Sequence, residues 1–268
     1  MSAAQGASGA ATVEAAVLWF CMRGNILLPA AAALLAASAL ASAAETSWRD
    51  IESRIQYGYY TEDGAALRNL RGLIAADESH DRLHGYYSAL LAWRESQLAA
   101  LGVASSRGVS AAQLAKRCVS EADNVLAAQA DFAAARALRA ACLGSPLNAG
   151  NSVISGRGAR QEIERALKSS PHDPRALLVD GMNEYQLSGG NKDRALGKLR
   201  RAVAAFEGER AGLEQLPGWG AAEAYLYLAR NLLDHADAVA ARDALEHALL
   251  IAPEFAQARR LMAHILGG

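Results

Sequence analysis

Two successive amphipathic helix patterns occupy residues 220–253, where apolar residues recur three and four positions apart. A polar break at residues 235–237 separates the two runs, and Pro253 ends the second because proline cannot continue a helix. Small residues let two helix axes approach closely, and they stand here where large residues are usual on a core face: Ala229, Ala241 and Ala248. The segment is therefore predicted to be a tightly packed pair of antiparallel helices.

Weaker versions of the same helical period follow along the rest of the chain, and no run alternates apolar and polar residues as a strand would. Residues 144–158 are rich in Gly, Asn and Ser, and this composition predicts a loop. Ser110 is a candidate N-cap. The predicted helices span residues 47–60, 65–76, 82–101, 110–128, 131–142, 159–168, 174–187, 191–206 and 254–266.

Composition agrees with an all-α chain. Of the 268 residues, 52% are hydrophobic, and the abundant alanine and leucine favour helices. The formal net charge of −1 argues against a dedicated binder of nucleic acid or of anionic membranes.

The N-terminal segment has the parts of a secretory signal peptide. A short basic start at Met22 precedes an apolar run over residues 26–40, and residues 41–43 form an A-x-A cleavage pattern. The predicted leader covers residues 1–43, with Met22 as the expected start and cleavage after Ala43, which directs the protein to a bacterial periplasm. The apolar run is shorter than the roughly 20 residues of a bilayer span, so no stable membrane insertion is expected after cleavage.

An alternative stays open for the same segment. Residues 13–40 would serve as an inner-membrane anchor if the leader were retained. Arg23 would then lie near the middle of the span, where a charge is unfavourable.

The sequence contains no pattern that predicts an enzyme, a cofactor or a metal site. G-x-S-x-G, Walker-type and G-x-G-x-x-G motifs are absent. His80 and His84 are spaced four apart beside acidic residues, but the glutamate of a zinc-protease motif is missing. We therefore expect a solvated polar turn there.

Cys118 and Cys142 are a candidate disulfide pair. They lie at similar distances on either side of a predicted helix turn near Ala130, and an exported protein meets an oxidising compartment. The alternative is that both are small buried residues in an alanine-rich interface.

The pattern of residues 220–253 resembles the tetratricopeptide repeat (TPR), a helix pair of about 34 residues with small and large residues at fixed offsets. The pattern of small and large residues in its second helix recurs in weaker form upstream, from Ala159 to Pro171 and again from Ala195. With Ala222 as the first position, the signature places fall on Tyr225, Leu228, Ala229, Leu232, Ala241, Leu245, Ala248 and Pro253.

The resemblance implies an α-solenoid of antiparallel helix pairs that winds into a TPR-like right-handed superhelix. It divides the mature chain into residues 44–158, where the repeats are eroded, and residues 159–268, which hold TPR-like repeats and a terminal capping helix.

The resemblance also implies a concave groove that is lined by the first helix of each pair and holds a protein or peptide partner. The Lys and Asn pattern of the family's carboxylate-clamp members is absent. Each inward-facing residue could instead serve only to pack helix against helix. The inward-facing places fall on Arg175, Met182, Tyr185, Gln186, Glu223, Leu226, Arg230, Asp234, Gln257 and Arg260.

The predicted function is that of a periplasmic scaffold or adaptor without catalytic residues. The alternative is a periplasmic small-ligand-binding or transport-accessory protein, which would need a closed apolar pocket. Such a pocket is expected around Tyr86, Tyr87 and Trp93.

Overall fold

The computed structural model describes residues 48–75, 82–103, 108–144, 152–186, 190–209 and 217–267. All described residues belong to one compact unit, Trp48–Gly268. The predicted leader, the alternative anchor over residues 13–40 and most of the polar turn at His80 lie outside the described residues.

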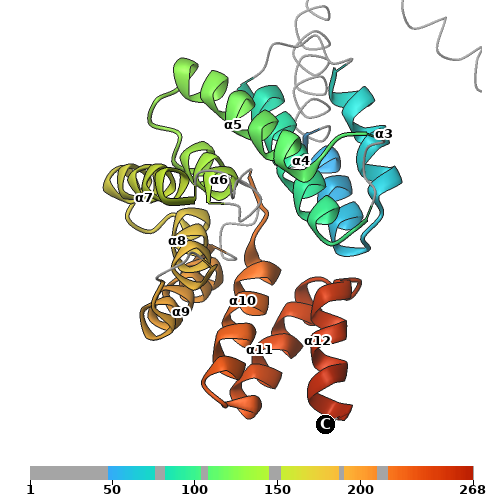
Figure 1. The fold of residues 1–268 in the computed structure, drawn as a ribbon, viewed down its shortest axis with the longest axis vertical. Helices are drawn as coiled ribbons and strands as arrows, with labels where there is room; N and C mark the ends of the chain where they lie inside the picture. Colours follow the sequence, from blue (N-terminus) through green and yellow to red (C-terminus); the bar gives the residue numbers. More distant parts are fainter. Residues whose placement is uncertain are drawn as a thin grey trace, which may run out of the picture. The chain divides into compact units, whose positions relative to one another are not determined.

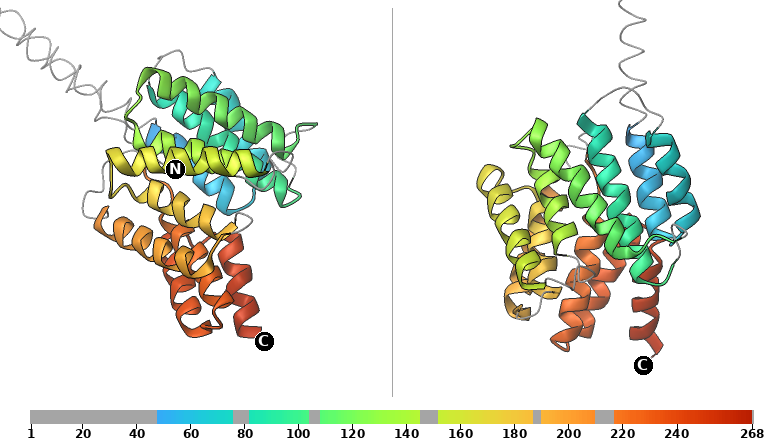
Figure 2. Two further views of the ribbon diagram at one scale, coloured as in Figure 1. Left: turned by 60° about the vertical axis from the view of Figure 1, so that its left-hand side comes forward. Right: turned by 45° about the horizontal axis from the view of Figure 1, so that its top comes forward.

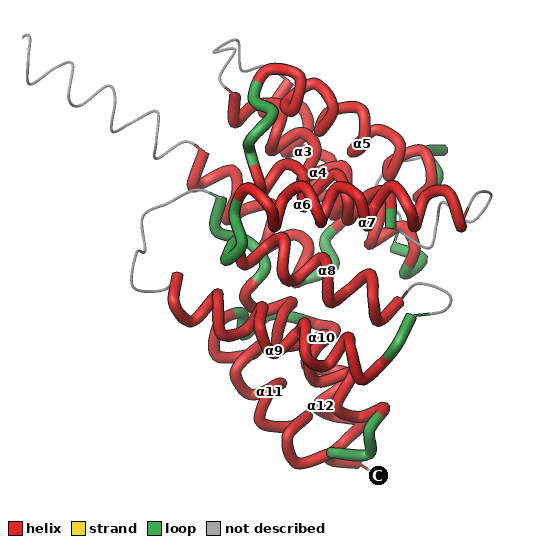
Figure 3. Tube along the Cα trace, turned by 90° about the vertical axis from the view of Figure 1, so that its left-hand side faces the viewer, coloured by secondary structure: helices red, strands yellow, loops and turns green. Residues whose placement is uncertain are grey.

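All regular structure in the described residues is α-helix, as Figure 3 shows, which confirms the predicted all-α class for this part of the chain. The first described helix covers residues 48–60. It is followed by α3 (Gly64–Ala75), α4 (Arg82–Ala100), α5 (Ala111–Ala128), α6 (Ala133–Leu143), α7 (Ser152–Ser169), α8 (Pro174–Gln186), α9 (Lys192–Glu209), α10 (Ala221–Asp234), α11 (Ala238–Ile251) and α12 (Ala256–Gly267).

Most helix ends fall within a few residues of the predicted ones, and Ser110 caps α5 through a capping box with Gln113. The predicted loop over residues 144–158 is wrong in its second part, because α7 begins at Ser152. Gly156 is buried, as are Ala159 and Ala166 further along α7. Packing of α7 against α6 thus overrides the low helix propensity of this segment. The predicted division at residue 158 also falls inside α7.

Helices that follow one another in sequence pack against one another (Figures 1 and 2). The closest packing joins α4 to α5, α6 to α7, α8 to α9 and α10 to α11. The first helices of neighbouring pairs also touch, as in α4 with α6 and α6 with α8. No helix in the described residues is long and apolar enough to cross a membrane.

Small residues set the spacing between paired helices. The alanines at the TPR-like places Ala159, Ala229, Ala241 and Ala248 have no exposed surface. A Cβ on Gly181 would lie 2.8 Å from a methyl group of Leu199, so α8 and α9 approach more closely than a side chain there would allow.

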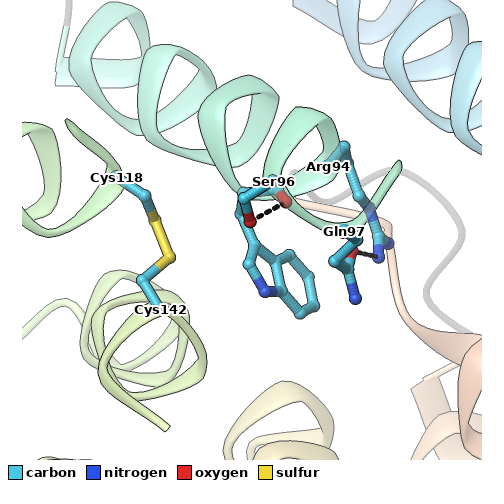
Figure 4. The surroundings of a disulfide bond; sticks show 6 residues. Arg94, Ser96, Gln97, Cys118 and Cys142 are labelled. Carbon is cyan, nitrogen blue, oxygen red and sulfur yellow. Dashed lines mark hydrogen bonds between the residues drawn. A yellow bond between two sulfur atoms is a disulfide. The ribbon is translucent and has the colours of Figure 1, made fainter. Parts of the chain in front are cut away.

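A disulfide bond joins Cys118 of α5 to Cys142 of α6, with Cα atoms 6.1 Å apart and both side chains fully buried (Figure 4). It therefore links the second helix of one pair to the first helix of the next. A bond that closes a loop of this length stabilises a fold by about 3 kcal/mol.

The two ends of the unit Trp48–Gly268 are in contact. Tyr59 and Tyr60 of helix 48–60 pack on Phe255, with ring centroids 5.9 and 4.5 Å apart. Arg260 of α12 forms an ion pair with Glu62, at 2.9 Å from its Nη1 to the nearer carboxylate oxygen. Helix 48–60 also contacts α10 and α12, since the Tyr60 hydroxyl donates to Glu223 and Gln257 Nε2 donates to the Tyr59 hydroxyl.

Candidate functional site

An inner cleft opens where the first helices of the pairs converge. Its lining comes from helix 48–60 and from α4, α6, α8, α10 and α12, and its volume is about 190 Å³. The aromatic lining is Tyr59, Trp93 and Tyr227; the carboxamide lining is Gln97, Asn183, Gln186 and Gln257; Arg230, Met182, Leu101, Ala100 and Ala141 complete it.

Helical spacing explains why these side chains share the cleft. Trp93 and Gln97 are four apart on α4, and Met182 and Gln186 are four apart on α8, so each pair lies on one face of its helix. The side chains also bind one another across helices, since Gln186 Nε2 donates to the Tyr227 hydroxyl at 2.7 Å.

Arg230 is the one charged residue in the described lining of the cleft. Its Nη2 donates to Gln257 Oε1 at 2.9 Å, and its guanidinium carbon lies 5.2 Å from the centre of the Tyr227 ring. In the part of the chain that the structure describes, no carboxylate forms an ion pair with it.

A buried polar network lies beneath the cleft. The fully buried Arg94 forms an ion pair with Glu223 and donates to Gln56 Oε1 at 3.0 and 3.1 Å. Its guanidinium carbon lies 4.1 Å from the centre of the Tyr59 ring. Arg94 Nη1 also donates to Gln97 Oε1 at 3.0 Å, and Figure 4 shows this hydrogen bond near the C-terminal end of α4.

The network is neutral because Glu223 balances the charge of Arg94. Burial acts to lower the pKa of Arg94, but the Glu223 carboxylate together with Tyr59 and Tyr60 outweighs burial, and the pKa is raised. Glu223 also accepts a hydrogen bond from the Tyr60 hydroxyl at 2.8 Å. The positive charge that the cleft presents is therefore that of Arg230.

Residues 217–220 lead into α10 and contact helix 48–60 and α4. Glu52 accepts from the Gly218 backbone N–H at 2.7 Å and from the Tyr87 hydroxyl, and burial raises the pKa of its carboxyl. Trp219 donates through its indole N–H to the Tyr86 hydroxyl. Gly220 has φ of 114°, a conformation that favours glycine.

A larger cavity of about 570 Å³ lies between α7, α8 and α9, and its charged residues on α8 and α9 are paired with one another. Lys198 lies 2.8 Å from Asp180 and 3.0 Å from Glu184, and Arg194 lies 2.9 Å from Glu184. Burial acts to raise the pKa of Glu184, but hydrogen bonds from the Asn191 backbone, Lys198 and Arg194 lower it to about 2. The charges on α8 and α9 thus satisfy one another, while Arg160 and Glu164 of α7 also line this cavity. We favour the inner cleft because helix 48–60, α4, α6, α8, α10 and α12 all contribute to its lining.

The structure divides the predicted groove residues into three groups. Met182, Gln186, Arg230 and Gln257 line the inner cleft together. Arg175, Glu223 and Leu226 are buried by the chain itself, with Arg175 bonded to both carboxylate oxygens of Glu209 at 2.7 and 3.0 Å. The third group lies outside the cleft lining and is paired within the chain: Tyr185 with Asp234 at 2.8 Å, and Arg260 with Glu62.

The aromatic pocket expected around Tyr86, Tyr87 and Trp93 is only partly present. Tyr86 and Tyr87 are fully buried and belong to the core. Trp93 lines the inner cleft instead.

Sequence reasoning missed Tyr59, Gln97 and Tyr227 as cleft residues. Tyr59 and Gln97 lie where the repeat signature is eroded, so no inward-facing place was assigned to them. The available signal was the spacing of Gln97 one helical turn after Trp93. In the described residues no group of three or more His, Cys, Asp or Glu side chains is arranged to hold a metal ion.

No model of a known protein family matches the chain, and a search of the curated proteins finds no match.

Proposed function

We propose that this chain is an exported, TPR-like scaffold or adaptor that binds a protein or peptide partner through the inner cleft. The observation that carries the proposal is the convergence of helix 48–60, α4, α6, α8, α10 and α12 on that one cleft. In the repeat that residues 220–253 resemble, the first helices of the pairs line the partner groove.

The packing order supports a solenoid of the TPR type. Consecutive helices pair, and the first helices of neighbouring pairs touch. The signature alanines are buried in the interfaces between paired helices. A right-handed superhelix of such pairs would present the alternate helices on its inner side.

The disulfide between Cys118 and Cys142 supports export, because such bonds persist in oxidising compartments. We propose the bacterial periplasm as the compartment. Fractionation of cells that express the full chain, with mass measurement of the mature N-terminus, tests this. A mature protein that begins at Ala44 is expected, whereas an uncleaved cytoplasmic protein would contradict export.

The size of the cleft limits what it can hold under either candidate function, binding of a partner protein or of a small ligand. A volume of about 190 Å³ is below the roughly 300–1,000 Å³ of typical ligand pockets. It accommodates one inserted side chain or a small metabolite. A partner protein is therefore expected to insert an anchor residue rather than to lay an extended segment along the groove.

The test is capture of partners from periplasmic extract with the wild-type chain and two variants. Arg230→Glu reverses the charge of the cleft, and the partner is expected to be lost. Arg242→Glu reverses an exposed charge on α11, outside the cleft lining, and the partner is expected to remain. Helical circular dichroism must be equal for the three proteins. Retention of the same partner by Arg230→Glu would contradict the assignment of the cleft.

A further inference from the structure

The lining of the inner cleft has an excess of hydrogen-bond donors. A guanidinium carries five N–H donors and no acceptor, and Arg230 directs one of them at Gln257 in the described residues. Asn183 lines both this cleft and the larger cavity between α7, α8 and α9, and its Nδ2 is buried without a hydrogen-bond partner among the described residues. A buried donor without an acceptor is unfavourable, so a ligand that brings acceptor oxygens is favoured.

The charge of the cleft is also unbalanced. The buried Arg94 is compensated by Glu223 beneath the cleft, and the acidic Asp234, one turn after Arg230, is held by Lys192 at 2.9 Å and by Tyr185 at 2.8 Å. Arg230 therefore keeps one positive charge in a partly desolvated setting, where an anionic ligand gains most.

The remaining lining specifies what accompanies the anion. Trp93, Tyr227 and Met182 offer apolar surface beside Arg230. Aromatic rings and a methionine bind aliphatic and aromatic groups rather than compact, fully hydrated anions. The volume of about 190 Å³ admits a group of the size of one amino-acid side chain.

We infer that the inner cleft is a receptor for a carboxylate on a short apolar stem, with Arg230 as its counter-ion. This inference rests on the proposed function only in using the same cleft. The carboxylate could belong to an acidic side chain of a partner or to a free small carboxylic acid. Both sources share the chemistry that the cleft recognises.

The experiment compares matched ligand pairs by isothermal titration calorimetry and ligand-observed NMR. The first pair is 3-phenylpropionate and 3-phenylpropionamide. The second is the capped peptide acetyl-Leu-Glu-Leu-amide and its Gln counterpart, which carry no terminal carboxylate. Each ligand is titrated into the full mature chain as wild type, as Arg230→Gln and as Arg242→Gln, the last being a surface control outside the cleft lining.

We expect at least one acid to bind the wild type about tenfold more tightly than its amide, the size of effect seen for a hydrogen bond to a charged group. Arg230→Gln is expected to bring the ratio close to one, and Arg242→Gln to leave it unchanged. A preference limited to the peptide assigns the carboxylate to a partner, and one limited to phenylpropionate assigns it to a metabolite.

Equal binding of acid and amide by the wild type, no binding of any of the four ligands, or an acid preference that survives Arg230→Gln would each overturn the inference. The proposed function is judged separately by partner capture. A partner that is lost with Trp93→Ala and retained with Arg230→Gln would leave partner binding in place and remove the role of the carboxylate.

Discussion

The buried ion pair between Arg94 and Glu223 is the contact whose loss should most clearly test the structure. The two residues are 129 positions apart in the chain, and their side chains are 0% and 2% exposed. Replacing Glu223 by Leu removes the counter-charge and leaves Arg94 with the neutral acceptors of Gln56 and Gln97. Leaving one partner of a buried pair uncompensated typically lowers the free energy of unfolding by about 3–5 kcal/mol.

The double variant separates the charge effect from packing. Arg94→Met should lower the free energy of unfolding by a similar amount, because Glu223 then keeps the Tyr60 hydroxyl as its one hydrogen bond in the described residues. Arg94→Met combined with Glu223→Leu leaves no buried charge and preserves most of the volume. Its loss is expected to fall short of the sum of the two single losses by about 2 kcal/mol or more.

The assay is urea denaturation at 25 °C, followed by helical circular dichroism, with equal m-values required for comparison. The exposed pair Arg242–Glu246 on α11 is the control, since exposed pairs contribute about 0–1 kcal/mol. If a single variant does not fold, Glu223→Gln replaces Glu223→Leu as the milder change. Losses that add within about 0.5 kcal/mol would show that the two charges do not interact, and would refute the buried pair.

Three further predictions concern stability. Gly220→Ala should lower the free energy of unfolding by about 1–3 kcal/mol, because φ is 114° and the new Cβ would lie 2.7 Å from an aromatic ring of α9. Gly197 lies in the middle of α9 on its exposed side, with open space around it, so Gly197→Ala should instead raise the free energy of unfolding by up to about 1 kcal/mol. Equal thermal shifts in the two variants would contradict the description of Gly220. Reduction of the Cys118–Cys142 disulfide should lower the free energy of unfolding by about 3 kcal/mol. Urea denaturation with and without reductant measures this loss, and a variant with both cysteines replaced by alanine should not respond to reductant. The pKa of Glu184 is lowered to about 2, below its value in the unfolded chain. The ionised carboxylate therefore contributes fully to the free energy of unfolding above about pH 5, and this contribution is lost as the pH falls towards 2. Glu184→Gln should reduce the acid-induced loss of stability, and an unchanged pH profile would count against the lowered pKa.

Local sequence determined the helices of this protein. The apolar spacing of residues 220–253 is a short-range property, and the pair α10–α11 follows it closely. Proline at residue 253 and the N-cap at Ser110 act on their own neighbours, so their effects could be predicted without the fold. Where the local signal was low in propensity, at residues 152–158, packing decided the helix.

The inner cleft was predicted only in part. Arg230 and Gln257 could be assigned because the repeat signature survives around them. Tyr59 and Gln97 could not, because the TPR-like pattern is weak in the N-terminal half. Glu223 was assigned to a partner, yet its charge is balanced by Arg94 of the same chain.

By itself, then, the sequence determined which segments are helical and which residues pair neighbouring helices. Only the tertiary structure decided what meets across the interior: Arg94 with Glu223, and Tyr59 with Phe255. The reason is physical. Pairing of neighbouring helices depends on side chains a few turns apart, whereas these long-range contacts depend on how each of the intervening helices packs on the next.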